Sequence, residues 1–170
     1  MKQMRKKGFT LVEMIIVVAI LGIMAAIVIP QFRGNVVQAK DSASLTNLAT
    51  VRTQIELYAL QHNSFPPGYV SGVGTTLAVL ELQFIGTTTV AGLASPSTVP
   101  ADPFLYGPYL RKIPKNPFSG LSTITYVAEA TAFSAVVDGT SSGWLYKKET
   151  GEIALNWTGS DIKGTPYYDY

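Results

Sequence analysis

An apolar run near the amino terminus constrains this chain more than any other feature. From Phe9 to Ile29 the sequence contains 21 residues, and their only charge is Glu13. At about 1.5 Å per residue, a helix of this length crosses a hydrocarbon core of roughly 30 Å. A secretory signal peptide has a shorter apolar region that ends at a site of small residues. The run therefore predicts a helix that spans a membrane.

Positive charge is concentrated just before this run. Residues 1–8 carry Lys2, Arg5, Lys6 and Lys7 and no acid, while the rest of the chain carries nine basic and eleven acidic residues. By the positive-inside rule, the basic end stays in the cytoplasm and the carboxyl-terminal part lies outside. Because the remainder is nearly neutral, we predict no nucleic-acid binding.

The sequence beyond the apolar run keeps helical character. Apolar residues recur there at steps of three or four, which places them on one face of a helix: Leu45, Leu48, Val51, Ile55 and Tyr58. Two prolines and a glycine in "HNSFPPG", residues 62–68, end that helix. We expect one helix of about fifty residues, with a kink or loosening near residues 22–30 caused by Pro30.

The remaining hundred residues predict a small sheet. A short helix is expected near residues 76–84. Three β-like runs follow at residues 122–130, 132–139 and 143–157, and the last of these is a hairpin. The fold class is therefore α+β, with the long amino-terminal helix packed on a small antiparallel sheet. The closing "GTPYYDY" is expected to be a surface tail.

Little in the sequence supports catalysis. The chain has no cysteine and one histidine, His62, which removes the material for thiol, zinc or Ser/His chemistry. "GTSSG" at residues 139–143 matches a serine-hydrolase pattern, but a strand-like run follows it where that motif needs a helix. We interpret it as a loop and predict that the protein is not an enzyme.

Calcium is the one cofactor that the sequence leaves open. Asp138, Asp161 and Asp169 carry oxygen ligands of the right kind, but they lie far apart and show no D-x-D spacing. Solvated surface carboxylates are the favoured interpretation. Calcium at Asp138 or Asp161 is kept as the alternative, and no other cofactor is predicted.

The segment "KGFTLVEMIIVVAILGIMAAIVIP", residues 7–30, resembles the amino-terminal segment of type IV pilins and of the pseudopilins of type II secretion. The resemblance implies a pilin-like fold and a prepilin peptidase that cuts between Gly8 and Phe9 and methylates the new amino group of Phe9. It assigns Thr10, Glu13 and Pro30 to the assembly segment. Glu13 would complement the amino group of Phe9 on a neighbouring subunit.

Small residues follow in the same segment. Ala19, Gly22 and Ala26 lie near one helix face and would let helices pack closely in the core of a filament. The resemblance then divides the chain into a basic leader at residues 1–8, a membrane-spanning and filament-core segment at 9–30, an amphipathic half-helix at 31–62, and a head at 63–170 with a variable loop and a carboxyl-terminal sheet.

Two later stretches are similar to major pseudopilins of type II secretion: "YALQHNSFPPG" and "GPYLRKIPKNPFSG". The carboxyl-terminal region departs from that pattern, because the aspartate-rich calcium loop of those proteins is replaced by the hairpin sequence "GWLYKKETGEIALNWTG". The cysteine pair of many type IV pilins is also missing. The pattern therefore favours a pilin-like subunit without deciding between pseudopilus and pilus.

The function implied is that of a structural subunit of a type II secretion pseudopilus, which polymerises into a helical filament and aids protein export. The first alternative is the major pilin of a type IV pilus, serving adhesion, motility or DNA uptake; the second is a single-pass anchored enzyme or binding module. Implied partners are copies of itself, the prepilin peptidase, the inner-membrane platform with its cytoplasmic ATPase, and minor pilins. The expected location is the bacterial inner membrane, with the carboxyl-terminal part in the periplasm, and then a periplasmic or cell-surface filament.

Overall fold

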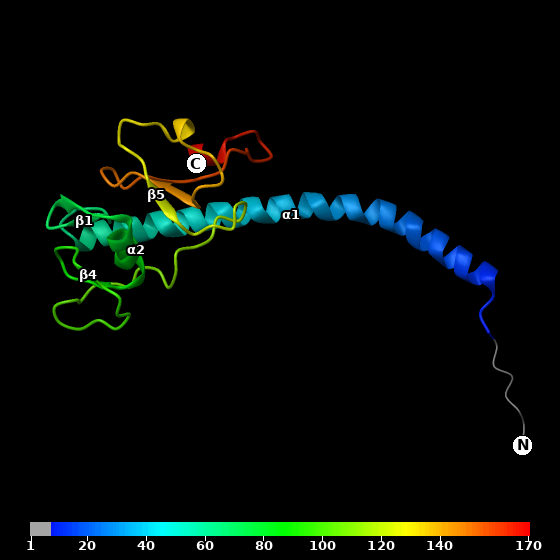
Figure 1. Ribbon diagram of the computed structural model, residues 1–170, viewed down its shortest axis with the longest axis horizontal. Helices are drawn as coiled ribbons and strands as arrows, with labels where there is room; N and C mark the ends of the chain where they lie inside the picture. The colour runs from blue at the N-terminus through cyan, green and yellow to red at the C-terminus, as the bar shows by residue number, and fades with distance from the viewer. Residues whose placement is uncertain (1–7) are drawn as a thin grey trace, which may run out of the picture. The chain divides into compact units, whose positions relative to one another are not determined.

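The computed structural model describes the backbone of residues 8–170 and their side chains, apart from those of residues 29–34. Residues 1–7 of the predicted leader, and the side chain of Pro30, lie outside this description. Helix α1 runs from Leu11 to Gln61 and is helical on both sides of Pro30 (Figure 1). The apolar run and the amphipathic stretch are therefore one helix, as expected, while the kink near Pro30 stays a prediction.

The chain divides into two compact units, Met1–Ala39 and Lys40–Tyr170. Packing against other elements thus begins at Lys40, inside the stretch of residues 31–62 that was predicted as the amphipathic half of the helix. We call Lys40–Tyr170 the head. It contains the second half of α1 and every other helix and strand.

The head buries the apolar stripe of α1. Leu48, Val51, Ile55 and Tyr58 are each at most 5 % exposed, as the helical spacing predicted. Leu45, the first member of the stripe, is 37 % exposed and forms the edge of the contact. An isolated helix of this length is marginal in water, so this burial is what stabilises the second half of α1.

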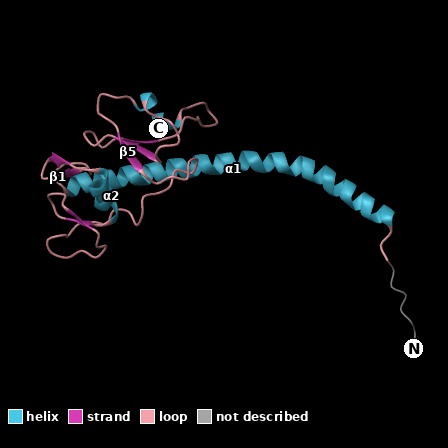
Figure 2. Ribbon diagram, in the orientation of Figure 1, coloured by secondary structure: helices cyan, strands magenta, loops and turns pink. Residues whose placement is uncertain are grey.

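Short elements surround this part of the helix, and loops connect them over most of the head (Figure 2). In chain order they are β1 (Tyr69–Val70), β2 (Val73–Gly74), α2 (Leu77–Ile85), β3 (Thr87–Thr88), β4 (Ala94–Ser95), β5 (Ile124–Tyr126), the 3₁₀ turn η1 (Phe133–Ala135), β6 (Trp144–Tyr146), β7 (Ile153–Leu155) and the 3₁₀ turn η2 (Tyr167–Asp169). β1–β2 and β3–β4 form two-stranded antiparallel sheets, and β5-β6-β7 form a third sheet. The α+β class, the helix near residues 76–84 and the hairpin of residues 143–157 are confirmed.

The third sheet differs from the prediction in two ways. β6 pairs with β7 in the antiparallel hairpin, but β5 pairs with β6 in parallel, so the sheet is mixed. The run at residues 132–139 is not a strand: it holds η1, and its chain carries the crossover that a parallel β5–β6 pair needs. The prediction of a purely antiparallel sheet with a strand at residues 132–139 was wrong at this point, because pairing direction depends on a connection that local sequence does not reveal.

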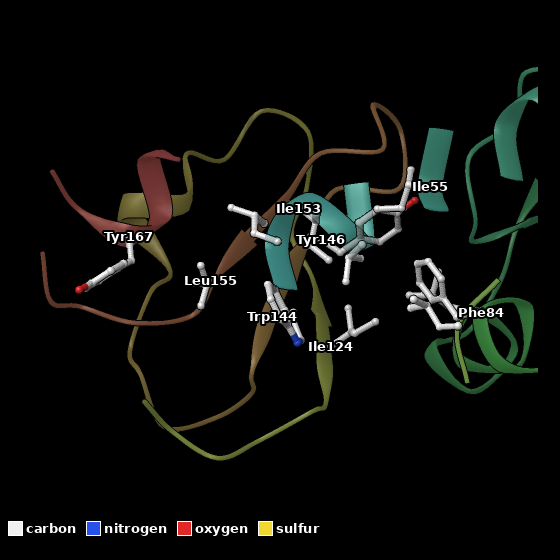
Figure 3. Packing of buried hydrophobic residues seen from close by; sticks show 12 residues of the cluster. Ile55, Phe84, Ile124, Trp144, Tyr146, Ile153, Leu155 and Tyr167 are labelled. Carbon is white, nitrogen blue, oxygen red and sulfur yellow. The ribbon is translucent and has the colours of Figure 1, made fainter. Parts of the chain in front are cut away.

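The hydrophobic core lies between the sheet and α1. The cluster joins Ile55 of the helix to four residues of the hairpin, to Ile124 of β5 and to Phe84 of α2 (Figure 3); the hairpin residues are Trp144, Tyr146, Ile153 and Leu155. Tyr167 closes it at the carboxyl-terminal end and is only 2 % exposed. The interpretation of "GTPYYDY" as a surface tail was therefore wrong for Tyr167, although Gly164 and Asp169 are exposed.

Candidate functional site at the start of the long helix

The predicted processing point lies in a non-helical segment before α1. Gly8, Phe9 and Thr10 are non-helical and exposed, and the first helical residue is Leu11. A Cβ atom placed on Gly8 would meet nothing within 4 Å, and the Phe9 side chain is 80 % exposed. Among the described residues, the peptide bond between Gly8 and Phe9 is therefore unobstructed.

Thr10 and Glu13 are brought together by reciprocal hydrogen bonds. The backbone N–H of Thr10 and its hydroxyl both donate to Oε2 of Glu13, each at 2.8 Å. In return the N–H of Glu13 donates to Oγ1 of Thr10 at 3.2 Å. This is a capping box, in which the residue before the helix and the third helical residue satisfy each other's free N–H groups.

The capping box gives Glu13 a local role that the sequence interpretation missed. Its signal was present in "TLVE", a threonine followed three residues later by glutamate at the start of an apolar run. Both donors use Oε2, and within the part of the chain that the structure describes Oε1 accepts no hydrogen bond. Glu13 thus caps the helix start with Oε2 and leaves Oε1 without a hydrogen-bond partner among the described residues.

The helix that follows is apolar on all sides. Its window Leu11–Val28 is long and apolar enough to cross a membrane, and none of that window is buried inside the protein. A helix with no polar face is stable only inside a membrane or against other proteins. This finding agrees with a membrane-anchored subunit.

The predicted packing residues lie in this exposed part. Ala19, Gly22 and Ala26 are spaced three and four apart, so they share one helix face, and all three are exposed. A Cβ on Gly22 would meet nothing within 4 Å. No described element of this chain covers that face, so its role in helix packing stays a prediction.

His62, the single histidine of the chain, directly follows the end of α1 and is buried. It is 2 % exposed and stacks on Tyr58 with ring centroids 3.7 Å apart. Nδ1 donates to the carbonyl of Tyr58 at 2.7 Å, and Nε2 contacts Oγ1 of Thr88 at 2.9 Å. Burial lowers the pKa of His62, which disfavours the charged form of the ring.

The remaining candidates lie in loops of the head. "GTSSG" is a loop between η1 and β6, as interpreted. Asp138 and Asp161 each accept hydrogen bonds from backbone N–H groups of their own loops. Within the described residues no group of three or more His, Cys, Asp or Glu side chains converges as metal ligands do.

Comparison with known proteins identifies the amino-terminal segment. Residues 3–29 match the prokaryotic N-terminal methylation motif. The type II secretion system core protein G of Vibrio cholerae serotype O1 is 28 % identical over 96 % of this chain and the whole of that protein. The protein of the same name from Klebsiella michiganensis is 26 % identical over 93 % of this chain and 97 % of its own length.

Type IV pilins are similar over less of the chain. The type IV major fimbrial protein FimA of Dichelobacter nodosus is 38 % identical, but over 42 % of this chain and 46 % of that protein. No solved structure gives a significant match. The motif and these relatives confirm the resemblance to pilins and pseudopilins.

Proposed function

We propose that this pilin-like chain is a structural subunit of a type II secretion pseudopilus. The observation that carries the proposal is a methylation motif, residues 3–29, joined to an apolar helix whose window Leu11–Val28 is not buried against any described part of the chain. Similarity to core protein G over nearly the whole chain favours the pseudopilus, because the similarity to type IV pilin FimA covers less than half. Its role is assembly, not catalysis.

The subunit is made as a single-pass precursor in the bacterial inner membrane. The basic leader of residues 1–8 stays in the cytoplasm, and the head lies in the periplasm. The prepilin peptidase cuts between Gly8 and Phe9 and methylates Phe9. The non-helical, unobstructed backbone at Gly8 supports this step, because a peptidase must reach the bond that it cuts.

Glu13 guides assembly through the charge that cleavage creates. An acid at the centre of a bilayer costs about 2.5–3.5 kcal/mol, which favours pairing with a cation over remaining alone. The capping box involves only the N–H and hydroxyl of Thr10, which cleavage after Gly8 leaves in place. Oε1 then receives the amino group of Phe9 from a neighbouring subunit.

Close packing of the apolar helices forms the filament core. Ala19, Gly22 and Ala26 provide one narrow face on which a second helix can approach. The partners in this process are copies of the same chain, the inner-membrane platform with its cytoplasmic ATPase, and minor pseudopilins. The finished filament lies in the periplasm and aids protein export.

Mass spectrometry of the mature amino terminus tests the proposal. N-methyl-Phe9 is the expected first residue, and an intact Met1 or a cut beyond Ala25 contradicts the assignment. A Gly8→Val variant should remain uncut. Because a Cβ at Gly8 meets nothing within 4 Å, that loss would report the peptidase contact and not a misfolded chain. Ala130→Val, at an exposed position of the head, is the control and should be cut normally.

A second candidate is the major pilin of a type IV pilus. The similarity to FimA supports this candidate, but only over 42 % of the chain. A deletion strain separates the two functions. Loss of secreted enzymes with unchanged surface piliation supports the pseudopilus, and loss of surface pili, adhesion, motility or DNA uptake with unchanged secretion supports the pilus.

A further inference from the structure

The aspartate-rich calcium loop expected from related pseudopilins does not fit the residues found here. A calcium ion needs six to eight oxygen ligands that converge on one point. The carboxyl-terminal loops of this head show the reverse of a calcium loop: a carboxylate lies at the centre of each loop, and hydrogen-bond donors point at it. This arrangement is independent of the proposed function.

Asp161 organises the loop before η2. Its Oδ1 accepts the backbone N–H groups of Lys163 and Thr165, each at 2.8 Å, and its Oδ2 accepts the hydroxyl of Tyr170. A further backbone bond from the N–H of Asp161 to the carbonyl of Thr165, at 2.9 Å, closes the loop. The donors, led by the Tyr170 hydroxyl, hold the pKa of Asp161 below its usual range. These three donors fill both acceptor sites of Oδ1 and one of the two on Oδ2.

Asp138 organises the loop before β6 by the same means. Its Oδ1 accepts the N–H groups of Thr140 and Ser141 at 2.9 and 3.1 Å, and the amide of Asn156 at 2.8 Å. Asn156 is fully buried, and its own Oδ1 accepts the N–H groups of Asp138 and Gly139. Backbone donors hold the pKa of Asp138 well below its ordinary value.

Two hydrogen bonds then join the carboxyl-terminal segment to α1. The hydroxyl of Tyr167 donates to the buried carboxylate of Asp41, and the guanidinium of Arg52 donates to the backbone oxygen of Tyr170. Asp41 and Arg52 are eleven residues apart, so the two bonds span about three turns of the helix. The ring of Tyr167 also contacts Phe118, with centroids 4.6 Å apart, which excludes water from one side of the bond.

We propose that the carboxyl-terminal part of the head is held closed by these two carboxylate-centred loops and by the Tyr167–Asp41 clasp, and that it needs no bound cation. The clasp does the work that a calcium ion does in an oxygen-lined loop, since it ties the last residues of the chain to the rest of the head. Removing one hydroxyl should weaken it, whereas removing calcium should not.

The test is thermal unfolding of the purified full-length chain in detergent, with calcium chloride or with EGTA. The expected unfolding temperature is the same in both. A bound calcium ion at a hundredfold excess over its Kd would raise that temperature by about 5–10 °C, and such a rise overturns the proposal.

A conservative pair of variants tests the clasp itself. Tyr167→Phe removes the hydroxyl that contacts Asp41, and Tyr168→Phe is the control, because no described residue bonds its hydroxyl. Tyr167→Phe should lower the unfolding temperature by about 2–6 °C and Tyr168→Phe by less than about 1 °C. Equal shifts for the two variants overturn the proposal.

Asp161→Asn separates an anion-centred loop from a cation site. The amide oxygen still accepts the N–H groups of Lys163 and Thr165, so only the contact with Tyr170 is lost, and a small drop of the same order as that of Tyr167→Phe is expected. If Asp161 held calcium, the variant would abolish a calcium-dependent rise in stability seen in the parent chain, and that result overturns the proposal.

Discussion

The two halves of α1 differ in how their apolar residues are buried, although they form one continuous helix. Residues 11–28 are apolar on every side and none is buried in the described chain, whereas residues 44–58 carry an apolar stripe that the head buries. The first half needs a membrane or other subunits to remove its surface from water, and the second half finds its partner in its own chain. Mutations in the halves should therefore act on different measurable properties.

A matched pair of leucine substitutions tests this separation most strongly. Leu155→Ala, in the core of the head, should lower the free energy of unfolding by about 2–5 kcal/mol. Leu21→Ala, in the exposed half of α1, should leave it unchanged within about 0.5 kcal/mol. Urea unfolding followed by tryptophan fluorescence reports the head alone, because Trp144 and Trp157 both lie there. A comparable loss for Leu21→Ala would show that the halves are not independent.

Removing the charge of Glu13 should give the next largest effect, and that effect should be confined to filament assembly. Glu13→Gln keeps an oxygen for the N–H of Thr10 but removes the charge, and Glu13→Ala removes both. We expect both variants to be cleaved and methylated, yet to form at least about tenfold fewer filaments, because the amino group of Phe9 loses its counter-ion. Filament counts in sheared fractions provide the measurement. If Glu13→Gln assembles normally, the role of Glu13 is capping and not charge.

Acid should weaken the head through His62 and leave the first half of α1 unaffected. Burial lowers the folded pKa of His62, so the unfolded chain binds a proton first as the pH falls. Stability is complete above the unfolded pKa of about 6.5 and is lost progressively below it, down to the folded pKa. The urea concentration at the unfolding midpoint should therefore decrease as the pH is lowered from 7 to 5. His62→Gln should remove that slope, and a slope that persists in the variant would contradict the assignment.

The capping box predicts the smallest change. Thr10→Ala removes the hydroxyl that accepts the N–H of Glu13, and it should cost the first helical turn about 1 kcal/mol, while Thr10→Ser should restore it. Hydrogen exchange of the Glu13 amide in detergent micelles measures this effect. Unfolding of the head should not respond to either variant.

Several features of the fold were readable from local sequence. The apolar run, the stripe of Leu48, Val51, Ile55 and Tyr58, the helix α2 and the hairpin β6–β7 each depend on periodicity or turn residues within a short window. The resemblance in residues 7–30 supplied the candidate site. The capping box of Thr10 and Glu13 was equally readable, because a threonine followed three residues later by glutamate marks a helix start.

Other features depend on residues far apart in the chain. Tyr167 lies in a polar stretch that reads as a tail, but it is buried because Asp41, 126 positions earlier, accepts its hydroxyl. Likewise, β5 pairs in parallel because of the path taken by the residues between it and β6.

The sequence by itself therefore determined which half of the long helix needs outside partners, since an apolar run without a polar face has no stable alternative in water. Only the tertiary structure decided how the head is closed. Whether a tyrosine, a histidine or a carboxylate is buried depends on which donors and acceptors the fold brings to it, and a buried polar group is stable only when such a partner is present.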